Sequence, residues 1–283
     1  MNTPTVPTHH KKRLQAHFGF TGMPFRKNVG ANQMFDSSAQ RELLHGLNLW
    51  LEIRGLALIT GPSGAGKSIT LRRFVRELPS ERYVVFRFNQ IPTTPGGFLR
   101  ALSRRLGLRT RSYVSDMFDA AKDCLGSWED RHGTHPIVIM DDAEGMRTET
   151  LDLVRRLTAG ELDADDRFSV LLAATERLLT TLREPILAPL CTRFGYVQAL
   201  RAFSIEDTRN YVRFHLEHAN TDPQLFSDHA ATAIFHATEG VPRSINQLAL
   251  QALIQTVVEG RDKVDGKLMK RVIHHHPLYS TAK

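Results

Sequence analysis

The chain has 283 residues, 41% of them hydrophobic, a formal net charge of +7 and two cysteines. This length predicts one large domain or a large domain with a small one, and two cysteines exclude a disulfide framework and a four-ligand zinc site. No apolar run is long enough for a transmembrane helix, and the polar N-terminus lacks the apolar segment of a secretory signal. We therefore expect a cytoplasmic protein with no membrane partner, whose basic balance favours polyanions.

Strands and helices alternate along the first two hundred residues. Residues 1–16 read as a flexible basic arm, and a loop-rich segment over 17–25 precedes a helix over 38–52. The expected strands are 56–60, 83–88, 137–140, 169–174 and 196–200. The expected helices between them are one ending near residue 78, then 94–108, 116–131 and 148–158. This alternation predicts an α/β domain with a parallel sheet flanked by helices on both faces.

From residue 201 onward the pattern indicates helices alone. Ser204 and Asp207 have the spacing of a capping box, with Asp in place of the usual Glu, and predict a helix to about residue 219. Ser227 is placed to cap a second helix, Pro242 to begin a third, and residues 264–272 form a fourth. The predicted domains are therefore an α/β domain over 17–200, a small helical lid over 201–272 and a tail over 273–283.

A phosphate-binding pattern follows the first strand directly. The segment Gly61-Pro62-Ser63-Gly64-Ala65-Gly66-Lys67-Ser68 fits G-x-x-x-x-G-K-[ST] completely. Glycines let backbone N–H groups converge on phosphates, and the N-terminus of the next helix attracts an anion. Lys67 is expected to bridge the β- and γ-phosphates, and the Ser68 hydroxyl to ligate magnesium. The segment therefore predicts a site for ATP and Mg²⁺.

Acidic and polar residues at later strand ends extend this site. Asp141 and Asp142 follow the strand 137–140, so we expect their carboxylates at the edge of the sheet where α/β proteins bind ligands. Asp141 is predicted to hold magnesium and Asp142 to orient or deprotonate the attacking water. Thr175, at the end of the strand 169–174, is placed to contact the γ-phosphate or this water.

In this order the features resemble those of the AAA+ superfamily, and more narrowly of the ExeA-type ATPases and their transposition relatives TniB, TnsC and MuB. The resemblance spans about residues 17–271. It rests on His17-Phe18-Gly19-Phe20 with Pro24-Phe25, the segment 61–68, Asp141-Asp142-Ala143-Glu144, and Gly240-Val241-Pro242-Arg243-Ser244-Ile245-Asn246.

The resemblance implies a role for each site residue. Gly61–Ser68 would be Walker A, Asp141 and Asp142 Walker B, Thr175 sensor 1, Arg193 an arginine finger and Arg243 sensor 2. An arginine finger from a neighbouring subunit makes hydrolysis depend on assembly, because the monomer lacks that charge. The resemblance thus implies an ATPase that works as a homo-oligomer, in a ring or a filament.

One residue departs from the family pattern. Relatives usually have Glu at the position of Asp142, and often Gln at that of Glu144. Aspartate is one methylene shorter, and a misplacement of about 1 Å can cost about a hundredfold in rate. We therefore predict slow hydrolysis that suits a switch, with the hypothesis that Glu144 compensates.

The resemblance and the charge pattern together favour a regulator of DNA transposition. ExeA-type ATPases continue into a membrane helix that is not in this sequence, which favours the transposition relatives. These oligomerise on duplex DNA, recruit or stimulate a transposase, and serve with a target-selection protein. In the helix 94–108 and the loop after it, the predicted contacts to DNA phosphates are Arg100, Arg104, Arg105, Arg109 and Arg111. A solvated helix face is the alternative for these arginines.

Two other classes of function stay open. One is a secretion or assembly ATPase that remodels protein partners without DNA. The other is a replication loader, or an ATP-gated scaffold without hydrolysis. A DNA pull-down with and without a non-hydrolysable ATP analogue distinguishes the first of these from a transposition regulator.

Overall fold

The computed structural model of the chain describes residues 8–26, 34–159 and 166–280. They divide into two compact units, one of residues 40–200 and one of the described residues before Gln40 together with those from Arg201 onward. The α/β unit and the helical unit, as we call them, divide between Leu200 and Arg201, where the pattern changes from alternating strands and helices to helices alone.

The α/β unit is built on one five-stranded sheet, in which all strands run parallel in the order β2-β3-β4-β1-β5. The strands are β1 (Leu56–Thr60), β2 (Tyr83–Phe88), β3 (His135–Asp141), β4 (Ser169–Ala173) and β5 (Phe194–Ala199). The helices are α2 (Ser38–Ile53), α3 (Lys67–Glu77), α4 (Pro95–Arg105), α5 (Val114–Gly126), α6 (Trp128–His132), η1 (Ala143–Gly145), α7 (Thr148–Thr158), α8 (Arg177–Leu182), η3 (Pro185–Leu187) and α9 (Ala188–Cys191). The predicted α/β fold with a parallel sheet flanked by helices is confirmed.

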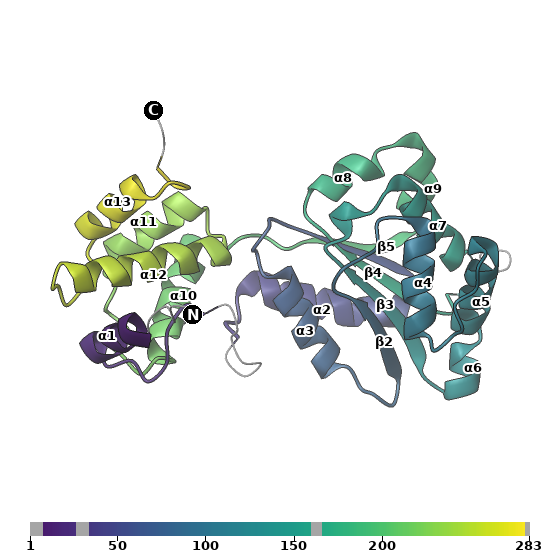
Figure 1. The fold of residues 1–283 in the computed structure, drawn as a ribbon, viewed down its shortest axis with the longest axis horizontal. Coiled ribbons are helices and arrows are strands. Elements are labelled where there is room, and N and C mark those ends of the chain that lie inside the picture. Colours follow the sequence, from purple (N-terminus) through teal and green to yellow (C-terminus); the bar gives the residue numbers. More distant parts are fainter. Residues whose placement is uncertain (1–7, 27–33, 160–165, 281–283) are drawn as a thin grey trace, which may run out of the picture. The chain divides into compact units, whose positions relative to one another are not determined.

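Helices cover both faces of this sheet. On one face α4, α5, α7, α8 and α9 share a continuous apolar core with strand residues such as Leu58, Val138 and Leu172. The residues between these in the strands, such as Ile59 and Ile139, are equally buried and point the other way, because side chains alternate along a strand. Helices α2 and α3 lie on that second side (Figure 1).

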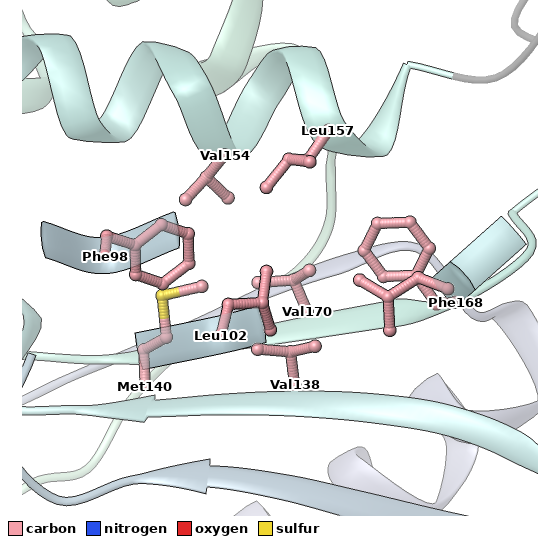
Figure 2. Close-up of a pocket in the computed structure, with 9 residues that line it drawn as sticks. Phe98, Leu102, Val138, Met140, Val154, Leu157, Phe168 and Val170 are labelled. Atoms are coloured by element: carbon pink, nitrogen blue, oxygen red, sulfur yellow. The ribbon is translucent and has the colours of Figure 1, made fainter. Parts of the chain in front are cut away.

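A small cavity remains in the core between the sheet, α4 and α7 (Figure 2). Its lining is apolar throughout and consists of Phe98, Leu102, Leu125, Val138, Met140, Val154, Leu157, Phe168 and Val170. Such a cavity offers water no hydrogen-bond partner and stays dry. We regard it as a packing defect and not as a site for a polar ligand.

Two helices differ from the prediction. The helix expected over 116–131 is two helices, α5 and α6, which meet at Ser127. The helix expected over 94–108 ends at Arg105, and Gly107 just after it has a positive φ of 72°, which glycine adopts without strain. Within the described residues no helix is both long and apolar enough to span a membrane.

The helical unit contains α1 (Thr8–Phe18), α10 (Ile205–Glu217), α11 (Asp228–Thr238), α12 (Pro242–Val258) and α13 (Gly266–His275). The predicted capping box is present, since the Asp207 N–H donates to Ser204 Oγ (3.0 Å) and the Ser204 N–H to Asp207 Oδ2 (3.4 Å). Ser227 caps α11 as predicted, accepting from the N–H of Ala230 at 3.2 Å. These side chains satisfy helix N–H groups that would otherwise lack a partner.

The N-terminal residues differ most from the sequence prediction. All of the predicted flexible arm within the described residues forms α1, whose Leu14 is buried in the core of the helical unit. Phe20 and Phe25 are buried in the same core, and the Phe35 ring lies 5.4 Å from that of Phe203. Because these aromatic side chains find their partners there, residues 17–26 and 34–39 group with the helical unit, whereas the prediction assigned them to the α/β domain.

Candidate functional site

Three predicted segments meet at the carboxyl edge of the sheet. Ala173 of β4 pairs with Ile59 of β1 on one side and with Asp141 of β3 on the other. The segment 61–68 follows β1, and Thr175 lies two residues after Ala173. The register therefore places this segment, Asp141 and Thr175 side by side.

The backbone of the segment 61–68 depends on glycine. Gly61, Gly64 and Gly66 have φ values of 152°, 88° and 108°. A Cβ on Gly61 would lie 2.4 Å from the carbonyl oxygen of Leu200, so no side chain fits there. Gly66 directly precedes α3, and no side chain caps the first turn of this helix. Its N–H groups are thus available to an anion.

Lys67 is buried at the start of α3, with 6% of its surface exposed. Its Nζ donates to the carbonyl oxygens of Gly61 (2.7 Å) and Pro62 (3.1 Å). Burial lowers the pKa of the Lys67 ammonium. Four carboxylates oppose that shift by charge, in decreasing order Glu144, Glu176, Asp141 and Asp142. The edge of the sheet therefore holds one buried cation among several acids.

Asp141 is buried to the same degree, with 4% of its surface exposed. Its Oδ2 lies 3.6 Å from Nη2 of Arg87 on β2, and its Oδ1 is buried without a hydrogen-bond partner among the described residues. A buried carboxylate oxygen without a partner costs free energy, and carboxylate oxygen is a ligand that Mg²⁺ accepts. The surroundings of Asp141 thus fit the predicted metal-binding role.

The two acids after β3 have different surroundings. Asp142 is exposed and has a left-handed backbone conformation, with φ 60° and ψ 43°. Glu144 lies in η1, and its Oε2 accepts a hydrogen bond from the Thr175 N–H at 3.3 Å. The Oγ1 of Thr175 is itself buried without a partner among the described residues. Glu144 is thus held against the end of β4, next to the residue predicted as sensor 1.

The remaining predicted site residues are Ser68, Arg193 and Arg243. Ser68 is exposed in the first turn of α3. Arg193 is half-buried directly before β5. Arg243 is exposed in the first turn of α12 and belongs to the helical unit, whereas the other site residues belong to the α/β unit.

The five predicted DNA contacts are exposed, but they do not form one uniform set. Arg105 donates from Nε to the carbonyl oxygen of Arg87 (2.9 Å) and from Nη1 to that of Ala101 (3.1 Å). Its guanidinium also lies 3.9 Å from the centre of the Phe88 ring. Arg105 therefore takes part in packing α4 on β2. The other four form no ion pair with any described residue: Arg100 and Arg104 on α4, and Arg109 and Arg111 in the loop after it.

Sequence reasoning missed two residues of the site. Arg87 approaches Asp141 from the neighbouring strand, and Glu176 raises the pKa of Lys67 by its charge. The available signal for Arg87 was a charged residue inside the otherwise apolar or aromatic strand β2. No local pattern marks Glu176, because its role depends on how close β4 lies to β1.

A scan against protein families finds that residues 52–182 match the model of an AAA domain. The parallel strand order and the glycine-rich segment after β1 agree with this match. The fold is that of the AAA+ P-loop ATPases.

Solved structures with a similar fold include two archaeal proteins. The ORC2 protein of Aeropyrum pernix has a TM-score of 0.63 and 17% identity, covering 89% of this chain and 71% of that one. The CDC6P protein of Pyrobaculum aerophilum has a TM-score of 0.61 and 16% identity, covering 85% of this chain and 67% of that one. At this level of identity the similarity concerns the fold alone.

In sequence the chain is similar to general secretion pathway protein A of Aeromonas hydrophila. The two are 28% identical over 253 residues, which cover 87% of this chain and 45% of that protein. The chain therefore spans less than half the length of this relative. The narrower resemblance to transposition proteins remains a prediction.

Proposed function

We propose that the chain binds ATP with magnesium at the carboxyl edge of the sheet and hydrolyses it. The observation that carries this proposal is a group of polar atoms that lack partners within the described structure. They are Asp141 Oδ1 and Thr175 Oγ1, at the same edge as the start of α3, which no side chain caps. Buried polar groups in folded proteins are nearly always paired, so two such atoms beside an uncapped helix N-terminus support a ligand at this edge.

Each residue would then have a defined task. The backbone of 61–68 and the Lys67 ammonium would bind the phosphates, whereas Ser68 and Asp141 would hold Mg²⁺, which neutralises developing phosphate charge when it is bound. Asp142 would orient the attacking water. Glu144, held against Thr175, is the second acid within reach of the same edge. Because Asp142 is one methylene shorter than glutamate, we expect slow turnover, as in a switch.

Two carboxyl variants test this assignment. Asp142→Asn should lower the ATP turnover rate by about a hundredfold or more, because the water loses its orienting group. Glu144→Gln should lower it less, since an amide oxygen still accepts from the Thr175 N–H. Glu149→Gln, an exposed change in the first turn of α7, is the control. Normal hydrolysis by Glu144→Gln would remove Glu144 from the mechanism.

We also propose that Arg193 acts on the ATP of a neighbouring subunit and that Arg243 senses the γ-phosphate from the helical unit, which serves as a lid. A mixing experiment tests the first role. Arg193→Ala and Lys67→Ala should each be inactive, yet a mixture of the two should regain part of the activity, because a Lys67→Ala subunit still offers its arginine to an intact site. Arg183→Ala, an exposed arginine after α8, should remain active. A mixture without recovered activity would contradict a finger acting between subunits.

We propose duplex DNA as the partner that ATP binding controls, in the service of DNA transposition. The supporting observation is charge: residues 82–115 contain seven arginines and no acidic residue. Arg100, Arg104, Arg109 and Arg111 are exposed and suited to phosphate contacts that do not read sequence. We leave Arg105 out of this proposed set because its guanidinium already donates hydrogen bonds to two backbone carbonyl oxygens. The transposase and the target-selection protein are proposed from the resemblance alone.

A secretion or assembly ATPase is the second candidate, and one observation favours it. The similarity to general secretion pathway protein A extends over 87% of this chain. In that case the partner is a protein, and the four exposed arginines are a solvated surface.

DNA binding with and without a non-hydrolysable ATP analogue separates the two functions. A transposition regulator should bind duplex DNA only with the analogue, with an affinity that falls steeply as salt rises. Replacing both Arg104 and Arg109 by Ala should weaken binding and reduce the salt dependence, whereas Arg76→Ala, an exposed arginine on α3, should not. Absence of DNA binding under all these conditions would favour the secretion or assembly function.

A further inference from the structure

Tyr113 differs from every other aromatic residue in the described part of the chain. Its side chain is 72% exposed, whereas the remaining phenylalanine, tyrosine and tryptophan residues there are buried or half-buried. It also lies within the arginine-rich stretch 82–115, which has no acidic residue. An exposed tyrosine alone is unremarkable in a protein surface, but this combination of an aromatic ring with unopposed positive charge is typical of surfaces that bind single-stranded nucleic acid.

The backbone around Tyr113 is well anchored. Tyr113 directly precedes α5, and its carbonyl oxygen accepts from the Met117 N–H at 3.3 Å in the first turn of that helix. Val114 lies against α4, with Cγ2 3.3 Å from the position that a Cβ on Gly96 would occupy. At the other end of the loop, the Leu108 N–H donates to the carbonyl oxygen of Ser103 at 2.8 Å. The ring is thus exposed on a fixed base, which lowers the entropy lost when it binds.

The charges around the ring favour an anionic partner. Arg109 and Arg111 precede it in the loop, are exposed, and form no ion pair with a described residue. The nearest acids in sequence are Asp116 and Asp119, both on α5 beyond the ring. Asp116 already accepts a hydrogen bond from the Ser115 hydroxyl at 3.2 Å. The loop between α4 and Tyr113 therefore contains only positively charged ionisable residues.

We propose that Tyr113, Arg109 and Arg111 form a binding surface for unpaired DNA, in which the tyrosine ring stacks on an exposed base and the two arginines contact the flanking phosphates. This inference rests on the proposed DNA-binding function and deepens it. Intact duplex buries its base faces in the stack, so it can use the arginines but not the ring. The surface consequently prefers single-stranded or locally opened DNA to intact duplex.

Two changes at Tyr113 test the stacking contact. Binding is measured by fluorescence anisotropy on the full chain with magnesium and a non-hydrolysable ATP analogue, using oligodeoxythymidylate and a duplex of equal length at two salt concentrations. Tyr113→Ala should weaken binding of the single strand about five- to a hundredfold, with an unchanged salt dependence and unchanged duplex binding. Tyr113→Phe keeps the ring and should stay within about twofold of the wild type.

Arginine variants separate this inference from the function on which it rests. Arg109→Ala should weaken binding of both DNA forms and reduce the salt slope by about one. Arg76→Ala on α3 serves as the charge-matched control. If Arg109→Ala weakens duplex binding while Tyr113→Ala changes nothing, the DNA-binding function stands and the stacking surface is disproved. Equal losses on both DNA forms with Tyr113→Ala, or tighter binding of oligouridylate than of oligodeoxythymidylate, would also overturn it. If neither form of DNA binds, both proposals fall.

Discussion

The start of α3 in the α/β unit differs from the starts of three helices in the helical unit. In the helical unit, Ser204, Ser227 and Asp265 each accept a backbone hydrogen bond at the start of a helix. In the α/β unit, α3 begins after Gly66 without a side-chain cap. A cap satisfies the helix from within, whereas an uncapped start leaves N–H groups for an anion. Caps do not divide the two units, since Thr94 caps α4 and no side chain caps α12. The glycine-rich segment before α3 is what distinguishes this helix start as a candidate anion site.

Buried ionisable groups differ between the two units. In the helical unit, burial lowers the pKa of His215 to about 4 and raises that of Tyr211 to about 12, so both are neutral at pH 7. In the α/β unit, the buried Lys67 is surrounded by carboxylates, and the buried Asp141 lies near Arg87. Charges are therefore kept where the proposed ligand carries charges of its own.

The largest effect is expected when a ligand fills the edge of the sheet. Mg-ATP at a hundred times its Kd should raise the free energy of unfolding by about 2.7 kcal/mol. Trp50 and Trp128 both lie in the α/β unit, so tryptophan fluorescence during urea unfolding reports this unit. Lys67→Met should abolish the gain and Lys122→Met, on α5, should keep it. If Mg-ATP still stabilises Lys67→Met, Lys67 does not bind the proposed ligand.

Acid should destabilise the helical unit through His215. Its pKa is about 4 in the fold and about 6.5 when unfolded, so this stability is complete above pH 6.5 and is lost as the pH falls towards 4. Between pH 7 and pH 5 the loss should be about 2 kcal/mol. Urea unfolding followed by circular dichroism at both pH values measures it.

Two histidine variants make this acid effect specific. His215→Phe should make the stability of the helical unit independent of pH over this range. It should also lower that stability equally at both pH values, because the Phe25 N–H loses its acceptor. His236→Phe, on an exposed position of α11, should keep the full dependence. Burial also lowers the pKa of His135 in the α/β unit, and tryptophan fluorescence reports that contribution separately. An unchanged pH dependence in His215→Phe would contradict the prediction.

The same substitution should have opposite effects in the two units. The Thr175 hydroxyl is buried without a partner among the described residues, so Thr175→Val should leave the free energy of unfolding unchanged or raise it by about 1 kcal/mol, while lowering ATP turnover. The Thr256 hydroxyl of α12 donates to the carbonyl oxygen of Ala252 at 2.7 Å. Thr256→Val should therefore lower the free energy of unfolding by about 1 kcal/mol. Urea unfolding without nucleotide compares them, and a destabilising Thr175→Val would show that this hydroxyl has a partner.

The smallest effects concern single serines at helix starts. Ser227→Ala should cost about 1 kcal/mol of stability, because the Ala230 N–H loses its acceptor. Ser68→Ala, in the first turn of α3, should cost less than about 0.5 kcal/mol, as it removes no cap. It should instead weaken the stabilisation by Mg-ATP. Thermal unfolding of each variant with and without Mg-ATP measures its intrinsic stability and its stabilisation by the ligand. Equal losses of stability in Ser227→Ala and Ser68→Ala without Mg-ATP would contradict the prediction.

By itself, the sequence determined the order of strands and helices and the glycine-rich segment after the first strand. Strands β1 and β2 and helix α7 have the predicted bounds, and the capping box at Ser204 is present. These features depend on side-chain periodicity and on backbone conformations that neighbouring residues dictate, so a local pattern suffices to predict them.

Only the tertiary structure decided which side chains meet. Arg87 approaches Asp141 because β2 lies beside β3, and Glu144 reaches Thr175 because η1 lies near the end of β4. Arg105, predicted as a DNA contact, donates a hydrogen bond to the backbone of β2, a contact that the sequence did not reveal. The order of strands in a sheet is a long-range property that no local pattern encodes, and it sets these contacts. The partners of Phe25 and Phe35 in the helical unit are also distant in the chain, so nearby residues could not predict them.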